Sequence, residues 1–210
     1  MLQRLAYDTI VHEHLEYYSL AVIERICAEA GLRVFRAELN ESNGGSLRCF
    51  IHQAGGLTRP PCANLARIRQ AEFEMQLDTS RPYQNFQHRA EAHRDELSAL
   101  IRRLVDQGKR VHLYGASTKA NTLLQWCNLD SRLISAAAER NPEKFGARTL
   151  GTDIPIVSES ESRAMKPDYY LVGPWHFKKE ILERESNGLR DNIGFIFPLP
   201  QIEIIGDPCT

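Results

Sequence analysis

Two histidines and a glutamate occupy successive positions near the start of the chain, as His12, Glu13 and His14. Histidine titrates near neutral pH, and a neighbouring carboxylate can orient the imidazole or stabilise its cation, so the triplet suits a general base. If the segment is extended, the two imidazoles point to one side and the carboxylate to the other. Two nitrogens are half a zinc site, and no third ligand stands at a recognisable spacing. Taken alone, the pattern is more typical of surface or core histidines.

A second group of polar residues surrounds Gly115, where a turn is expected to open a helix. It consists of Tyr114, Ser117, Lys119 and Asn121. Free backbone N–H groups, hydroxyls and one ammonium at such a turn could hold an anion. N-capping by Ser117 beside a surface lysine is an equal alternative. A single glycine is a poor match to the G-x-G-x-x-G fingerprint, which argues against a dinucleotide such as NAD.

A third group follows later strands of the same region. Glu139 and Asn141 come after the second strand, where a carboxylate could accept a hydrogen bond from a ribose hydroxyl. Trp175 and His176 come after a later strand and could stack and hydrogen-bond in a cleft. A buried aromatic residue and a satisfied core histidine would give the same pattern.

The composition narrows the class of protein. The chain has 210 residues, of which 42% are hydrophobic and 25% charged, as in an ordinary globular protein. A net charge of -1 removes the electrostatic reason to expect nucleic acid or an anionic membrane as a partner. The five cysteines lack CxxC spacing, so they predict reduced core residues rather than a disulfide or metal framework. Without a long apolar run or a signal sequence, we expect a cytoplasmic protein.

The first block, residues 1–58, predicts a helix followed by a β-hairpin. Apolar residues recur at helical spacing over residues 19–30, with Ser19 as N-cap and Gly31 just after the helix. Two strand-like runs, LRVFRAEL and GSLRCFIHQ, are joined by the turn-forming NESNGG. A helix and a hairpin bury too little surface to be stable alone. We therefore expect residues 1–52 to expose apolar surface and to form an oligomer or be disordered.

The middle block, residues 59–107, begins after the breaker GGLTRPP and predicts a helical connector. Arg, Glu and His residues fill the polar face of its second helix, so we expect His88 and His93 to face solvent rather than to bind a ligand. The opposite face is an apolar stripe of Phe86, Ala90, Leu97, Leu100, Ile101 and Leu104.

The last block, residues 108–210, alternates strands with helices. Strands are predicted at RVHLYG, LISAAAE, IPIV, DYYLVG and GFIFPLP, and helices at STKANTLLQWC, ESESRAM and FKKEILERES. Right-handed crossovers return each strand beside an earlier one, so the fold class is α/β with a Rossmann-like, mostly parallel sheet. Ligands of such sheets bind beyond the carboxyl ends of the strands, where the second and third polar groups lie.

Several segments resemble the S-adenosylmethionine-dependent sugar C-methyltransferases, which methylate nucleotide-linked 4-keto-deoxysugars. YDTIVHEHLEYYSLAVIERICAEAGLRVFRAELNESNGGSLRCFI is similar to the end of their class I methyl-donor domain. VHLYGASTKANTLLQWC, ERNPEKFG, LGTDIPIV, KPDYYLVGPWHFKKEI and FIFPLP resemble successive motifs of their Rossmann-like C-terminal domain. The resemblance covers nearly the whole chain. The family's four-cysteine zinc module and glycine-rich donor loop do not occur in this sequence.

The resemblance implies a role for each part of the chain. The family's Y-H-E-H motif supplies the active site, which places His12, Glu13 and His14 on H-E-H and gives His14 the role of base. Val11 stands at the tyrosine position and cannot donate a hydrogen bond from its side chain. The base would form an enolate beside the ketone, and the enolate carbon would then take the methyl group of S-adenosylmethionine. The C-terminal cleft would hold the nucleotide-sugar.

Because the donor loop is missing, we expect little or no methyl transfer by this chain alone, and an S-adenosylmethionine site that lies largely outside it. No bound metal is expected. The alternative is a nucleotide-sugar-binding or subunit-interaction module without catalysis. In both cases the expected partner is a nucleotide-sugar, with a homo-oligomer through residues 1–52 as the expected protein contact.

Overall fold

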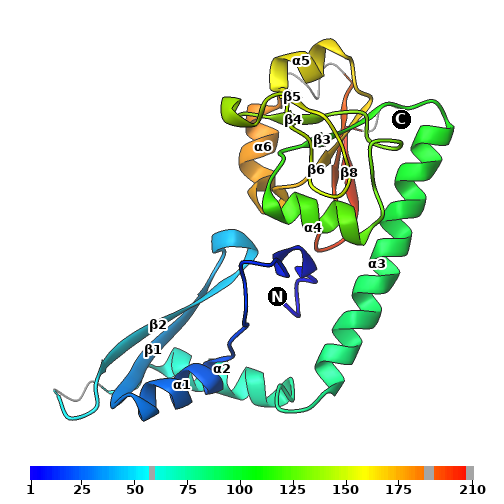
Figure 1. The fold of residues 1–210 in the computed structure, drawn as a ribbon. Coiled ribbons are helices and arrows are strands. Elements are labelled where there is room, and N and C mark those ends of the chain that lie inside the picture. The colour runs from blue at the N-terminus through cyan, green and yellow to red at the C-terminus, as the bar shows by residue number, and fades with distance from the viewer. Residues whose placement is uncertain (57–59, 187–191, 207–210) are drawn as a thin grey trace. The chain divides into compact units, whose positions relative to one another are not determined.

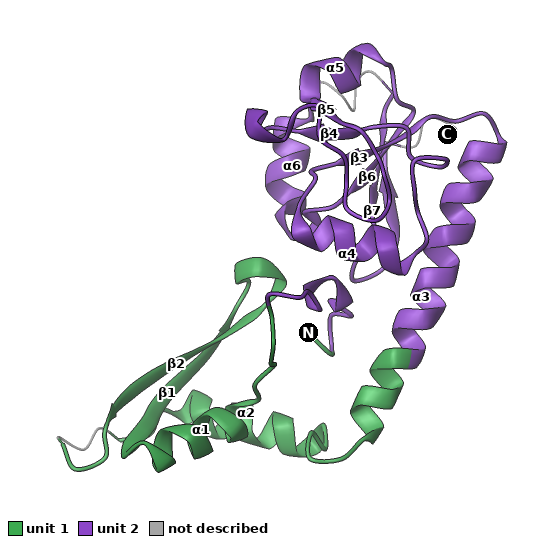
Figure 2. Ribbon diagram, in the orientation of Figure 1, with its two compact units in different colours: residues 1–2, 14–87 green, residues 3–13, 88–210 purple. Residues whose placement is uncertain are grey.

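The computed structural model describes residues 1–56, 60–186 and 192–206. They divide into two compact units (Figure 2), one of residues 1–2 and 14–87 and one of residues 3–13 and 88–210. The predicted domain boundary between residues 58 and 59 lies outside the described residues, as does Cys209. A long helix, α3 (Arg81–Asp106), begins in the first unit and continues in the second.

The first unit contains the predicted helix and hairpin (Figure 1). Its elements are α1 (Leu20–Glu29), β1 (Leu32–Asn40), the 3-10 helix η2 (Ser42–Gly44), β2 (Ser46–Gln53) and α2 (Ala63–Glu74). The Oγ of Ser19 accepts from the backbone N–H of Val22 as the expected N-cap, and Gly31 ends the helix with a φ of 70°. The two strands pair antiparallel, with a bulge between Val34 and Arg36.

A small core holds the first unit together. The carboxylate of Glu72, on α2, accepts from the backbone N–H groups of Leu20 and Ala21 at 2.6 and 3.1 Å, so it satisfies free donors at the start of α1. The buried residues of this core are Leu20, Cys27, Val34, Ala37, Leu65 and Ile68. The same unit leaves large apolar side chains exposed, among them Leu15, Tyr18, Ile26, Leu39, Ile51 and Phe73.

The second unit is built on a six-stranded sheet of order β5-β4-β3-β6-β7-β8. The strands are β3 (Val111–Tyr114), β4 (Ala137–Glu139), β5 (Ile156–Ser158), β6 (Tyr169–Val172), β7 (Gly194–Phe197) and β8 (Glu203–Ile205). All neighbouring pairs are parallel except β7 with β8. This confirms the predicted α/β fold with a mostly parallel, Rossmann-like sheet. The antiparallel edge strand β8 was not predicted from the sequence.

Beside α3, the second unit contains the helices α4 (Thr118–Trp126), α5 (Glu159–Ala164) and α6 (Lys178–Arg184) and the 3-10 helices η1 (Tyr7–Thr9), η3 (Pro142–Lys144) and η4 (Trp175–Phe177). Side-chain contacts join α4 to α3 and α5 to the end of α6. The indole of Trp126 on α4 donates to the Ala90 carbonyl of α3, and Arg163 on α5 pairs with Glu185 just after α6. The connections β3–α4–β4 and β6–α6–β7 run in opposite directions along the sheet, so the right-handed crossover rule predicts that α4 and α6 cover opposite faces.

The α3 stripe is buried as predicted, and all six of its apolar residues are less than a tenth exposed. The strand predicted from residue 133 begins only at Ala137, because the N–H groups of Leu133 and Ile134 turn back to the Asp130 carbonyl. Cys27 and Cys127 are buried free thiols, whereas Cys49 and Cys62 are half-buried free thiols. Among the described residues, no helix combines the length and apolar character that crossing a membrane requires.

Candidate functional site

The triplet lies at the point where the two units meet in sequence. His12 and Glu13 belong to the second unit and His14 to the first. Residues 7–9 form η1 and residues 12–13 form a turn, so the extended conformation considered from the sequence does not occur. The side chains of His12 and Glu13 are 81% and 60% exposed, with Nε2 and Oε1 3.9 Å apart. They are therefore open to solvent and to a ligand.

The segment ahead of the triplet is anchored by a buried tyrosine. The Tyr7 hydroxyl lies 2.9 Å from Nδ1 of His93, whose Nε2 lies 2.5 Å from the Pro198 carbonyl oxygen. A carbonyl can only accept, so Nε2 donates to it, and Nδ1 accepts from Tyr7. Cys127, with Sγ 3.6 Å from the Tyr7 hydroxyl, then donates to that oxygen.

The prediction that His93 faces solvent is therefore wrong. His93 is only 5% exposed, whereas His88 is exposed as expected. The physical reason is that Tyr7 of η1 contacts the ring of His93 edge-on, at 5.5 Å between ring centroids. Burial lowers the pKa of His93, which keeps the imidazole neutral and able to accept from Tyr7.

A cluster of polar residues lies beside this anchor. The Trp175 indole donates to Oδ2 of Asp8 at 2.7 Å, and both side chains are buried. Burial raises the pKa of Asp8 and outweighs the Trp175 hydrogen bond and the attraction to Lys119. Burial likewise lowers the pKa of Lys119 against the attraction to Asp8, and it lowers the pKa of His176, to which repulsion by Lys119 adds. We call Asp8, Lys119, Trp175 and His176 the aspartate cluster.

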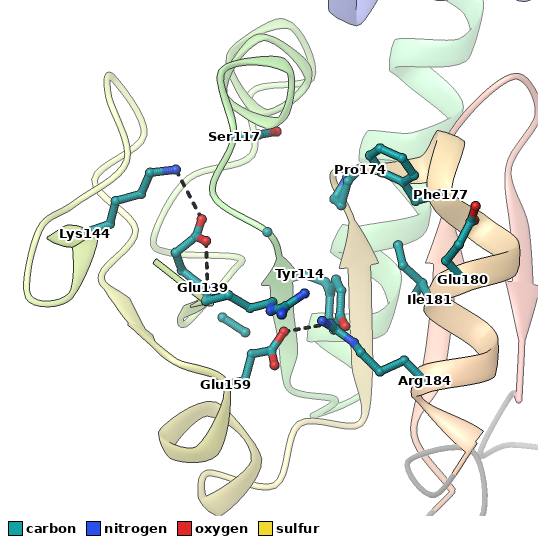
Figure 3. Close-up of a pocket in the computed structure, with 13 residues that line it drawn as sticks. Tyr114, Ser117, Glu139, Lys144, Glu159, Pro174, Phe177, Glu180, Ile181 and Arg184 are labelled. Carbon is teal, nitrogen blue, oxygen red and sulfur yellow. Dashed lines mark hydrogen bonds and ion pairs between the residues drawn. The ribbon is translucent and has the colours of Figure 1, made fainter. Parts of the chain in front are cut away.

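A cavity of about 450 Å³ opens at the carboxyl ends of β3 and β4 (Figure 3). That size suits a small-molecule ligand, and ligands of doubly wound sheets bind at this edge. Three of the predicted residues line it, namely Tyr114, Ser117 and Glu139. The other predicted residues, Lys119, Asn121, Asn141, Trp175 and His176, do not line it.

Two of these three residues are occupied by structural contacts. The Tyr114 hydroxyl donates to Oε1 of the buried Glu185 at 2.7 Å, so Tyr114 offers the cavity its ring rather than its hydroxyl. Ser117 accepts from the backbone N–H of Ala120 at 3.2 Å, which is the N-cap that the sequence left open. The Arg184 guanidinium lies 5.3 Å from the centre of the Tyr114 ring.

Glu139 organises the rim of the cavity. Its carboxylate accepts from the backbone N–H groups of Ala116, Arg140 and Asn141 and pairs with the Lys144 ammonium at 3.3 Å. Burial alone would raise the pKa of Glu139, but these N–H donors and Lys144 outweigh it and lower the pKa. A carboxylate has about four acceptor positions, and four donors occupy them here. No acceptor position is left for the ribose hydroxyl that the sequence suggested.

The two predicted asparagines lie elsewhere. Asn141 caps η3, with its side-chain oxygen accepting from the Glu143 backbone N–H at 3.1 Å. The side-chain oxygen of Asn121 is buried, and no hydrogen-bond partner reaches it within the described part of the chain.

The turn after β3 is packed tightly against the turn after β6. Gly115 has a φ of 85°, and a Cβ there would lie 2.9 Å from Cδ of Pro174. A Cβ on Gly173 would lie 2.7 Å from Cβ of Ala120 and 2.8 Å from the Gly115 carbonyl oxygen. Pro174 thus fills the side of Gly115 that faces β6, at the switch point of the sheet. This packing disfavours a dinucleotide pyrophosphate at that point, as the single glycine suggested.

Sequence patterns did not identify several charged residues that line the cavity. Arg140, Lys144 and Arg184 bring cations, while Glu159 and Glu180 bring carboxylates. Arg184 pairs with Glu159 at 2.7 Å across the cavity (Figure 3). Two of these residues could have been expected from the sequence, because Arg140 and Glu159 directly follow strands at their carboxyl ends. No sequence pattern points to Asp8. Among residues 1–56, 60–186 and 192–206, no group of three or more His, Cys, Asp or Glu side chains could hold a metal ion.

The chain's second unit is a doubly wound α/β domain with a cavity at the carboxyl edge of its parallel strands. A family model described as "C-methyltransferase C-terminal domain" matches residues 41–200, and the chain belongs to this family. The chain is also 32% identical over 212 aligned positions to "C-methyltransferase NovU" of Streptomyces niveus. The alignment covers the whole chain but 50% of that protein, so the chain spans about half the length of the curated relative it matches.

Proposed function

We propose that this chain is the substrate-side half of a C-methyltransferase that acts on a nucleotide-linked keto-deoxysugar. The observation that carries the proposal is the cavity at the carboxyl edge of a domain that belongs to the C-methyltransferase C-terminal family. The name of the relative from Streptomyces niveus supports carbon as the methylated atom.

The cavity would hold the nucleotide part of the substrate. Arg140 and Lys144 stand at its rim, and the Arg184 guanidinium covers the Tyr114 ring, so cations and a flat stacking surface lie within one space. Guanidinium and ammonium groups pair with phosphate oxygens, and a guanidinium plane can stack on a base. Glu139 would act by holding Lys144 and the rim backbone in place rather than by binding ribose.

The triplet would supply the base. His14 would remove the proton on the carbon beside the ketone, while His12 or Glu13 would orient it or stabilise nearby charge. Val11 offers no hydroxyl at the position where the family has tyrosine, so any charge stabilisation by that tyrosine must come from another residue.

S-adenosylmethionine would supply the methyl group, activated by its positively charged sulfur. The described residues do not fit this donor, because no two glycines are spaced as in its loop and Pro174 packs against Gly115. We therefore assign no residue of this chain to it and expect no methyl transfer by this chain alone.

Proton exchange separates the base from the missing donor site. A keto-sugar nucleotide incubated with the chain in D2O should exchange the hydrogen beside its ketone, without any S-adenosylmethionine, and NMR reports that loss of signal. His14→Gln should abolish the exchange, whereas His88→Gln, at an exposed histidine of α3, should leave it unchanged. Equal exchange in wild type and His14→Gln would rule out His14 as the base.

A second candidate function is a subunit-interaction module. It is favoured by the exposed side chains of Leu15, Leu39 and Phe73 in the first unit, which are 90%, 64% and 78% exposed. Exposed apolar side chains bind another protein where they form one contiguous patch, and this candidate requires such a patch on the first unit. This candidate includes the homo-oligomer through residues 1–52. Light scattering tests it, because a monomer at high concentration would contradict self-association through this surface.

A further inference from the structure

Two of the cations that line the cavity are paired with carboxylates of the same cavity. The Lys144 ammonium lies 3.3 Å from Glu139, and Nη2 of Arg184 donates to Oε1 of Glu159 at 2.7 Å (Figure 3). Such a pair opposes an anionic ligand, because the ligand has to replace the carboxylate that the cation already holds. The two pairs therefore decide how the cavity receives a phosphate.

The two carboxylates differ in what holds them. Glu139 accepts from three backbone N–H groups of the rim, so it stays in place even when Lys144 turns away. Glu159 is the first residue of α5, and its carboxylate accepts from the flexible side chain of Arg184. The Glu159 side chain is 27% exposed, so it can turn toward solvent. Of the two carboxylates, Glu159 is the one that a ligand can displace.

Arg184 has further contacts that keep it in position without Glu159. Its Nε lies 3.3 Å from Oε1 of Glu185, and its guanidinium carbon lies 5.3 Å from the centre of the Tyr114 ring. Glu185 is only 2% exposed and also pairs with Arg163, which makes it a fixed partner. Nη2 of Arg184 can therefore change its partner while the rest of the guanidinium stays where it is.

A phosphate is the partner that suits this exchange. Phosphate oxygens match the donor geometry of a guanidinium, and the resulting charge-assisted hydrogen bonds are strong. Arg140 and Lys144 line the same cavity, so a phosphate beside Arg184 interacts with further cations. Phosphate and the Glu159 carboxylate are both negative and repel each other at close range, so the two anions cannot share Nη2 of Arg184.

We propose that Glu159 is an internal competitor for the Arg184 guanidinium, which a phosphate of the nucleotide displaces when it enters the cavity. The inference rests on the proposed function, which assigns the nucleotide to this cavity. The competitor neutralises Arg184 while the cavity is empty. It also lowers the affinity for the nucleotide and favours release of the product, because Glu159 forms its pair again as the phosphate leaves.

Protonation removes the competitor. Burial, and then repulsion by Glu185, raises the pKa of Glu159, so this carboxyl takes up a proton at a higher pH than an ordinary glutamate does. A neutral carboxyl neither holds the guanidinium as strongly nor repels phosphate, so nucleotide affinity should rise as the pH falls. The charged groups around Glu159 or in the same cavity are Glu139, Arg140, Lys144, Arg163, Glu180, Arg184 and Glu185.

Calorimetry with thymidine-diphosphate-linked glucose tests the competitor. This probe lacks the terminal phosphate proton that titrates at about pH 6, so its own charge stays constant. Glu159→Gln, which keeps the shape of the side chain, should bind the probe about tenfold more tightly than the wild type at pH 7.5. Glu183→Gln, at an exposed glutamate of α6 that does not line the cavity, is the matched control and should bind like the wild type. The advantage of Glu159→Gln should shrink at pH 5.5.

The outcomes separate this inference from the function on which it rests. If neither the wild type nor Glu159→Gln binds the probe, the assignment of the nucleotide to the cavity fails, and the competitor fails with it. If the wild type binds the probe and Glu159→Gln binds it equally or more weakly, only the competitor is wrong.

Proton uptake is a readout that needs no variant to fold. Binding of the probe to the wild type at pH 5.5 should take up protons, because the displaced Glu159 carboxylate loses its cation and lies near a phosphate. Calorimetry in buffers of different ionisation enthalpy measures this uptake. A binding heat that is the same in all buffers would overturn the competitor.

Discussion

Tyr7→Phe tests how the segment that carries the triplet is held on the second unit. The change removes one hydroxyl and keeps the ring, so no large cavity is created. It leaves Nδ1 of His93 and the Cys127 thiol without their partner, at sites that are 5% and 0% exposed. A buried acceptor without a partner costs about 1–3 kcal/mol, and we expect the free energy of unfolding to fall by about 2 kcal/mol.

Urea unfolding at pH 7.5 measures this loss, because His93 is neutral there and can accept. Tyr83→Phe is the matched control, since its hydroxyl donates to the Leu77 carbonyl at 2.7 Å on the surface and should be worth less than about 0.5 kcal/mol. The amide of Ile10, which bonds to the Tyr7 carbonyl, should exchange faster in Tyr7→Phe. A loss no larger than that of Tyr83→Phe would refute the anchor.

Two further predictions concern the sheet. His112 is fully buried, with Nδ1 2.7 Å from the Ser162 hydroxyl, and burial with repulsion by Arg110 lowers its pKa to about 4. Because this folded-state pKa lies below the ordinary value of about 6.5, the contribution of neutral His112 to the free energy of unfolding is fully present above pH 6.5. That contribution, about 3 kcal/mol in all, is lost as the pH falls toward 4. In urea unfolding, the advantage of wild type over His112→Gln should shrink between pH 7.5 and 4.5, and a constant advantage would contradict the assignment. Gly173→Ala should cost about 1–3 kcal/mol because its Cβ would overlap Ala120, whereas Gly55→Ala, which meets nothing within 4 Å, should be nearly neutral; equal unfolding midpoints would show that the two turns can separate.

Local patterns predicted much of the fold. The α1 helix, its Ser19 cap and the parallel strands depend on residues close together in sequence or on period and handedness, and these were confirmed. β8 was not predicted because it is three residues long and antiparallel. The sequence therefore shows neither a long apolar run nor a crossover helix that would indicate a strand there. The turn at residues 12–13 follows η1, which was likewise not predicted.

The site was harder to predict because its contacts join distant residues. His93 is buried by Tyr7, 86 positions away, and Asp8 meets Trp175, 167 positions away. Glu139 stands at the expected strand end, yet its acceptor positions are used by the rim itself, which no pattern of residue types reveals. Residue types located the carboxyl edge of the sheet where the cavity lies, but only the fold shows which side chains remain available there.

The most direct test of the proposed function is a paired calorimetric titration of this chain with a keto-sugar nucleotide and with S-adenosylmethionine. The cavity at the carboxyl ends of β3 and β4 predicts binding of the keto-sugar nucleotide with one site per chain. The lack of a glycine-rich loop predicts no measurable heat with S-adenosylmethionine. Binding of S-adenosylmethionine without the keto-sugar nucleotide, or of neither, would contradict a substrate-side half.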